Sequence, residues 1–245
     1  MTTRTIAVVS AGLSNPSSTR LLADRLTAAT VDALRARGDD ATVEVVELRT
    51  HARDLADNLV AGFPNESLRS AVDTVSGADG LIAVTPIFSA SYSGLFKTFF
   101  DVLDKEALVG KPVLLGATAG TARHSLALEH AVRPLFSYLR AVTVPTAVFA
   151  ASEDWAGAGG VDRALADRID RAAGELADLV TGRPASARPV DPFADPTTSF
   201  EDLLRGREPT AVSEGGADPP WGASAVMIAM IASRSAAAGR PQPGR

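Results

Sequence analysis

Five short apolar runs, separated by longer amphipathic stretches, constrain the fold of this 245-residue chain more than any other feature. The runs are Thr5–Val9, Val43–Leu48, Gly80–Thr85, Pro112–Ala117 and Val144–Ala150. All but Val43–Leu48 are nearly continuous in apolar residues, which is typical of strands covered on both faces. Because a helical stretch follows each run, the order predicts a parallel sheet with helices on both faces.

The stretches between the runs have the spacing of amphipathic helices. In the first stretch, apolar residues step by four, three and four: Leu22, Leu26, Ala29 and Ala33. This spacing places them on one helix face, and Ser17 and Ser18 stand where an N-cap is expected. Further helices are expected around Leu68–Val75 and over Gly94–Leu103, His124–Leu139 and Val161–Val180. The pattern predicts an α/β flavodoxin-like three-layer sandwich with a five-stranded parallel sheet of order 2-1-3-4-5, the more charged Val43–Leu48 lying at an edge.

The character of the chain changes after Gly182. We expect residues 1–182 to form one flavodoxin-like domain and residues 183–245, rich in Pro, Ala and Gly, to be a largely disordered tail. Two short apolar segments interrupt the tail, Phe200–Leu204 and Trp221–Ala232. An alternative is that Phe193 and Phe200–Leu204 dock on the domain or on a second subunit.

Composition excludes several classes of protein. The chain has no cysteine, so disulfides, thiolate metal sites and a cysteine nucleophile are ruled out. A formal net charge of −5 argues against a nucleic-acid partner. The longest late apolar stretch, Ala223–Ala232, is about half of the roughly 20 residues that a membrane helix needs. There is no G-x-x-x-x-G-K-[ST] and no G-x-G-x-x-G, and we expect a cytoplasmic protein without a membrane or nucleic-acid partner.

Three loops follow the first, third and fourth runs, where doubly wound sheets bind ligands. The first, Ser10–Arg20, carries five hydroxyl side chains before it enters a helix: Ser10, Ser14, Ser17, Ser18 and Thr19. Hydroxyls and free helix N–H groups suit a phosphate, although an ordinary capped loop would look the same. In the second, Thr85–Leu95, backbone amides could face a flat ring, and the third, Thr118–Arg123, is small and polar. Arg123 or the following His124 could reach a phosphate, or His124 could simply be an exposed helix-start residue.

Three segments resemble the NADPH-dependent FMN reductase family, particularly the subgroup that partners luciferase-like monooxygenases. They are VVSAGLSNPSSTRLLADRL, ADGLIAVTPIFSASYSGLFKTFFDVLD and GKPVLLGATAGTARHSLALEHAVRPLFSYLRA, within a resemblance that covers roughly residues 4 to 181. The resemblance implies FMN, NADPH or NADH, and a homodimer or tetramer. It implies that the FMN site is formed by Ser10, Ser17, Ser18, Thr19, Pro86, Ile87, Phe88, Ser89, Thr118, Ala119, Gly120 and Thr121. Many relatives have a serine where Gly12 stands and a basic residue near Asn15, so a charged phosphate contact is weakened here.

Hydride transfer from nicotinamide to flavin needs no side-chain nucleophile, and we expect neither a catalytic side chain nor a metal site. The function expected is an NAD(P)H-dependent FMN reductase, with the supply of reduced FMN to a flavin-dependent monooxygenase as a candidate role. Two alternatives stay open: an NAD(P)H:quinone or azo reductase, and a non-enzymatic flavodoxin-type electron carrier. The sequence does not decide the electron acceptor, the partner oxygenase or the choice between NADPH and NADH.

The segment Gly94–Leu103 has more apolar surface than one face of a sheet needs. Phe96, Phe99, Phe100 and Leu103 stand at i, i+3, i+4 and i+7. Because aromatic residues are enriched at interface cores, we expect this helix to form a homodimer contact. The resemblance implies flavin sites near that surface, where Tyr92 or a phenylalanine would help to enclose the partner's flavin. The alternative is a helix buried within one subunit.

Overall fold

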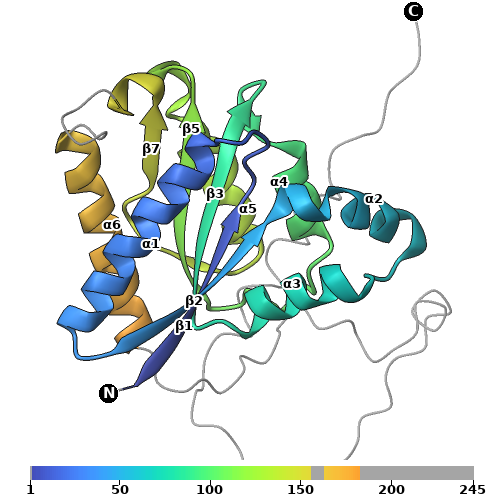
Figure 1. Ribbon diagram of the computed structural model, residues 1–245, viewed down its shortest axis with the longest axis horizontal. Helices are drawn as coiled ribbons and strands as arrows, with labels where there is room; N and C mark the ends of the chain where they lie inside the picture. Colours follow the sequence, from blue (N-terminus) through green and yellow to red (C-terminus); the bar gives the residue numbers. More distant parts are fainter. Residues whose placement is uncertain (1, 156–162, 183–245) are drawn as a thin grey trace, which may run out of the picture. The chain divides into compact units, whose positions relative to one another are not determined.

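A central parallel sheet organises the computed structural model, which describes residues 2–155 and 163–182. Its main strands are β2 (Asp40–Glu47), β1 (Thr3–Ser10), β3 (Gly80–Phe88) and β5 (Pro112–Ala119), adjacent in that order. Two short strands, β6 (Val142–Thr143) and β7 (Val148–Ala151), pair with the remaining edge of β5. The two-residue β4 (Ser91–Tyr92) pairs antiparallel with the end of β3. The flavodoxin-like α/β fold and the edge position of β2 are confirmed (Figure 1).

The expectation of one strand over Val144–Ala150 is corrected by the structure, where two short strands replace it. The sheet has seven strands, not five. β6 pairs with the start of β5 and β7 with its end. Between them stands Pro145, which has no N–H to donate to a ladder. The next N–H, that of Thr146, donates to the Glu175 carboxylate at 2.7 Å instead of to β5. One predicted strand position is therefore filled by two segments.

Helices cover both faces of the sheet. On one face lie α1 (Ser18–Ala36) and α6 (Arg163–Gly182); on the other lie α3 (Glu66–Gly77), α4 (Gly94–Asp101) and α5 (Arg133–Tyr138). In β1, Ile6 and Val8 pack in the core beneath α1 and α6, whereas Ala7 and Val9 pack in the core beneath α3, α4 and α5. This division explains why the strand sequences are continuously apolar.

Two features of the helices differ from the sequence-based expectation. The helix α2 (Ala52–Ala61), preceded by the 3₁₀ turn η1 (Leu48–His51), was not predicted, and Leu55 is its buried residue. The single helix expected over His124–Leu139 is instead a 3₁₀ turn η2 (Ala122–His124), a π-helix η3 (Leu128–Val132) and α5. Pro134 cannot donate to the carbonyl four residues before it, and the chain ahead of it has the wider π spacing. A further 3₁₀ turn, η4 (Ser152–Trp155), follows β7.

The phenylalanines of α4 lie inside the subunit. Phe96, Phe99 and Phe100 are at most 2% exposed, and Leu103 is 8% exposed. The Phe100 ring centroid lies 4.9 Å from that of Phe136 on α5, in an edge-to-face arrangement. The expectation that these side chains form a dimer contact is therefore wrong, because they already fill the core between α4, α5 and the sheet. The phenylalanine face of α4 is instead buried within one subunit.

The predictions for the C-terminal segment lie outside the described residues. They concern the boundary after residue 182 and the apolar positions Phe193, Phe200–Leu204 and Trp221–Ala232. Among residues 2–155 and 163–182, no helix has the length and apolarity to cross a membrane. In the same residues, no group of three or more His, Asp or Glu side chains is placed to hold a metal ion.

Candidate functional site

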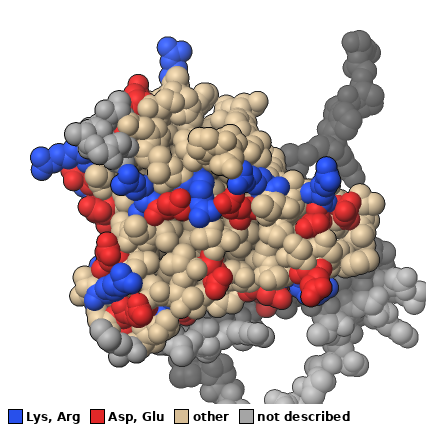
Figure 2. Space-filling view, viewed as in Figure 1, with Lys and Arg blue, Asp and Glu red and all other residues tan. Residues whose placement is uncertain are grey.

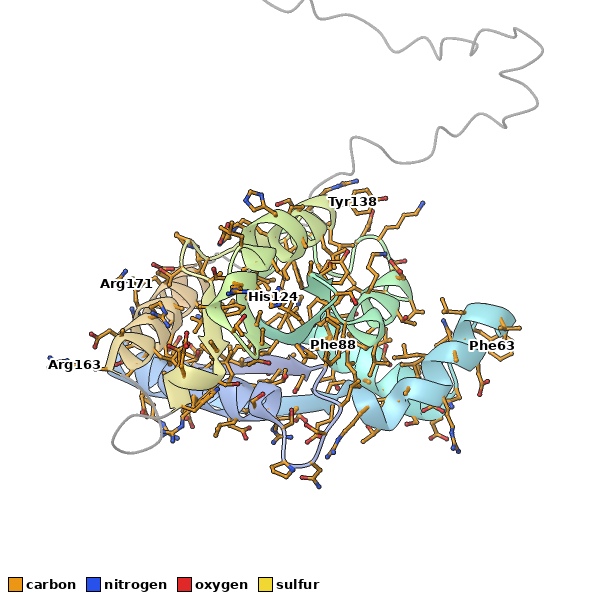
Figure 3. All side chains as sticks on the ribbon, turned by 90° about the horizontal axis from the view of Figure 1, so that it is seen from above. Phe63, Phe88, His124, Tyr138, Arg163 and Arg171 are labelled. Carbon is orange, nitrogen blue, oxygen red and sulfur yellow. The ribbon has the colours of Figure 1, made fainter. Side chains whose placement is uncertain are left out.

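The three loops singled out in the sequence meet at the carboxyl edge of the sheet. β1 ends at Ser10, β3 at Phe88 and β5 at Ala119, and these strands are neighbours in the sheet. Their register places Ser10 opposite Val84, two residues before Pro86, which pairs with Thr118. Figure 3 looks onto this edge, where Phe88 and His124 are labelled. The fold thus brings all three predicted groups of residues to one edge.

The first loop runs into α1 through an N-cap. Ser17 has an extended backbone, and its Oγ accepts from the Arg20 N–H at 3.3 Å, so the predicted cap is confirmed. Ser10 is buried beneath the loop, whereas Ser18, the first residue of α1, is exposed. The helix N-terminus therefore presents Ser18 and backbone N–H groups at this edge, the arrangement that favours an anion.

Thr19 joins the first loop to the third. Its Oγ1 lies 2.8 Å from Oγ1 of Thr118, and both residues are at most 3% exposed. The hydroxyl pair connects the first turn of α1 to the end of β5 across 99 residues of sequence. This bond fixes the relative position of two of the predicted ligand loops.

Gly12 is required by the close approach of the loop to its own cap. A Cβ atom at this position would lie 2.1 Å from the Ser17 Oγ. A side chain at position 12 would therefore not fit unless Ser17 moved. The residue at position 12 and the Ser17 cap of α1 therefore depend on each other.

The second loop is a tight hairpin between β3 and β4. Pro86 and Ile87 are buried, whereas Phe88 is 50% exposed. Ser89 and Ala90 form the turn with φ values of 49° and 68°, the left-handed region that usually takes glycine or asparagine. Phe88, the last residue of β3, lies at the carboxyl edge of the sheet directly before this turn (Figure 3). Of the predicted ring-binding residues, Phe88 and Ser89 are the exposed ones.

The third loop leaves the sheet after Ala119 and becomes exposed. Ala119 is half-buried, and Gly120 and Thr121 are exposed. The side chains of Arg123 and His124 follow on η2 and are also exposed. Small residues at 119 to 121 let a ligand approach the backbone closely at this point.

A pocket of about 280 Å³ opens beside the first loop. Its lining includes residues of that loop, the first turns of α1 and the end of β2: Ser10, Gly12, Ser14, Asn15, Pro16, Ser17, Arg20, Leu21, Asp24, Glu47 and Arg49. Sequence reasoning missed Glu47 and Arg49, since only the loops after the first, third and fourth runs were considered. Glu47 lies near the end of the second apolar run and Arg49 directly after it, and this position was the signal that could have found them.

The charged side chains of this pocket are paired with one another. Arg20 contacts the carboxylates of Asp24 and Glu47, and Glu47 also binds Arg49 at 2.8 Å. The hydrogen bond to Asp24 raises the pKa of the Arg20 guanidinium above its ordinary value, and the charge of Glu47 adds to this. Figure 2 shows acidic and basic side chains interspersed in the same way across the face in view.

The parallel sheet, the hydroxyl-rich loop at its switch point and the capped helix define a flavodoxin-like protein with a mononucleotide-type site. The model of the NADPH-dependent FMN reductase family matches residues 4–156. The chain belongs to this family, which confirms the resemblance seen in the sequence. It is an oxidoreductase of the FMN-dependent class that uses NAD(P)H.

Three similar proteins place the chain within the family. An FMN reductase (NADPH) of Pseudomonas aeruginosa is 37% identical over 73% of this chain and 93% of its own length. The NADH-dependent FMN reductase SfnE of Pseudomonas putida is 38% identical over 69% of this chain and 88% of its own length. A solved oxidoreductase from Corynebacterium diphtheriae is 48% identical, with a TM-score of 0.72 over 75% of this chain and 100% of its own. The similarity therefore extends over most of the described domain.

Proposed function

We propose that the protein binds FMN across the three loops and lets NAD(P)H reduce it there. The first loop, with Ser10, Ser17, Ser18 and Thr19, is the proposed phosphate site. The residues Pro86 to Ser89 and Thr118 to Thr121 are the proposed surroundings of the ring. When bound, FMN supplies the ring that accepts hydride from the nicotinamide.

The Thr19–Thr118 bond carries this proposal, because it holds the phosphate-type loop and the third loop at one fixed spacing. The available chemistry fits the group: a helix N-terminus and hydroxyls for a phosphate, and a half-exposed aromatic ring at Phe88 for a flat heterocycle. The chain's own part is to bind and orient the two cofactors, as hydride transfer demands alignment rather than a nucleophile.

The experiment compares FMN with riboflavin, which lacks the phosphate. We expect Ser18→Ala to weaken FMN by about 1 to 1.5 kcal/mol and to leave riboflavin unchanged, since one bond to the phosphate is lost. Phe88→Ala should weaken both flavins. Ser137→Ala, at an exposed serine on α5, is the control. If Ser18→Ala changed both flavins equally, the loop would not be the phosphate site.

We also propose that the reduced FMN is passed to a flavin-dependent monooxygenase, as the resemblance to the monooxygenase-partnered subgroup implies. Anaerobic stopped-flow with NADPH and NADH, followed by FMN, quinone and azo-dye acceptors, tests this role. Faster turnover with FMN than with the other acceptors is the expected result. A quinone or azo dye reduced faster than FMN would support the alternative reductase, and no oxidation of either nicotinamide would support a carrier.

A homodimer or tetramer remains a proposal that rests on the family, now without the α4 phenylalanines. Exposed apolar side chains of the described residues include Leu59, Val60 and Phe63 at the end of α2, with Phe63 projecting in Figure 3. Light scattering at micromolar concentration measures the state directly. A folded monomer with full reductase activity would remove the proposal.

A further inference from the structure

Glu47 stands between the proposed phosphate loop and two arginines. It is the last residue of β2 and the register partner of Ser10, where the loop begins. One carboxylate oxygen contacts Nη1 of Arg20, and the other accepts from Nε of Arg49 at 2.8 Å. Arg49 also reaches the loop itself, where its Nη1 lies 3.4 Å from the Ser14 carbonyl oxygen. All these residues line one pocket.

The loop carries no cation before its last residue, Arg20. Residues 10 to 19 contain no lysine or arginine, so Arg20 and Arg49 supply the positive charge of the pocket lining. Glu47 and Asp24 supply two negative charges, which leaves a formal sum of zero for the lining. A phosphate dianion would meet N–H and hydroxyl dipoles here but no net positive charge, and such a site binds anions less tightly than one with free guanidinium groups.

We propose that Glu47 sets the affinity of this site for the flavin phosphate by holding Arg20 and Arg49, so that FMN binds loosely enough to leave once reduced. The inference rests on the proposed function, because a protein that hands reduced FMN to a partner has to release it. Glu47 acts through the two arginines and is therefore a positioning residue.

Asp24 is less suited to this role. It contacts Arg20 as an i,i+4 pair on the surface of α1, and its side chain is 53% exposed. The Glu47 side chain is 26% exposed, contacts both arginines and neighbours Ser10 across the β1–β2 ladder. The more buried and shared carboxylate has the larger effect on the field at the loop, because solvent screens it less.

The test measures the Kd of FMN and of riboflavin for five variants. Glu47→Gln frees one unit of positive charge, and we expect the Kd of FMN to fall about three- to tenfold at low salt while that of riboflavin stays unchanged. The gain should shrink at high salt, and the rate of FMN release in stopped-flow should fall in parallel. Glu47→Asp, which keeps the charge, and Glu44→Gln, at an exposed carboxylate on the same strand, should match the unmodified protein.

Arg49→Gln provides the opposite change and should raise the Kd of FMN alone. The double variant Glu47→Gln/Arg49→Gln restores the charge balance and should return the Kd to within about twofold of the starting value. Should Glu47→Gln fail to fold, the Arg49→Gln arm decides the question. FMN affinity that is unchanged or lower in folded Glu47→Gln, or a gain shared by riboflavin, would overturn the inference. Failure of the proposed function differs, since the unmodified protein would then bind riboflavin as tightly as FMN.

Discussion

The buried hydroxyl pair between Thr19 and Thr118 allows a quantitative test of how the site is held together. Thr118→Val keeps the shape of the side chain and suits a strand, but it leaves the Thr19 hydroxyl buried without this partner. An unsatisfied buried hydroxyl costs about 1 to 3 kcal/mol, so the free energy of unfolding should fall by that amount. Thr19→Val should have a similar cost.

The double variant separates this bond from simple loss of packing. With both hydroxyls replaced, neither polar group is left unpaired, and the total loss should be smaller than the sum of the single losses by about 1 kcal/mol. Urea unfolding of the four proteins, with the slope checked for constancy, gives the coupling energy. Strictly additive losses would refute the view that the two loops are joined through this pair. A parallel FMN titration should show weaker binding in each single variant.

Three further predictions concern single positions. Gly12→Ala should destabilise the protein by about 1 kcal/mol and weaken FMN binding, because the new Cβ displaces the Ser17 cap. Gly77→Ala, at the end of α3 where the new Cβ meets no atom within 4 Å, is the control in both the unfolding and titration assays. Lys111→Met should lower the free energy of unfolding by about 1 to 3 kcal/mol, because the Nζ of this buried lysine donates to two carbonyls at the end of α3. An unchanged midpoint in urea unfolding would contradict this. The hydrogen bond from the Arg133 guanidinium lowers the pKa of Glu129. The small difference in unfolding free energy between the protein and Glu129→Gln should therefore be present at pH 7 and vanish as the pH falls through that lowered pKa. A difference that persists in acid would be inconsistent with this account.

The strands could be predicted because burial on both faces leaves a signal in consecutive residues. Ile6 to Val9 are all buried, so every position of that segment is apolar. The cap at Ser17 was equally local, since it depends on a hydroxyl three residues before a helical N–H. The approach of the three loops followed from the rule that parallel strands end at the same edge.

Long-range contacts account for what the sequence did not reveal. The split of the last strand depends on Glu175 binding the N–H of Thr146, 29 residues away. The phenylalanine spacing of α4 is the same whether a partner subunit or Phe136 covers it, so periodicity alone could not separate an interface from a core. Glu47 was missed because its role depends on Arg20, which lies 27 residues earlier in the chain.

The turn at Ser89 and Ala90 limits the range of orientations that the neighbouring Phe88 ring can adopt. Ser89 and Ala90 both have the left-handed backbone conformation that glycine adopts freely, and this costs folding free energy at each position. Glycines at these positions would remove that cost, but they would also let the turn sample left-handed and right-handed backbone conformations, and Phe88 would then adopt a wider range of orientations. The turn therefore narrows the angular spread of a half-exposed ring at the carboxyl edge of the sheet, so the tilt of that surface is set before any ligand arrives.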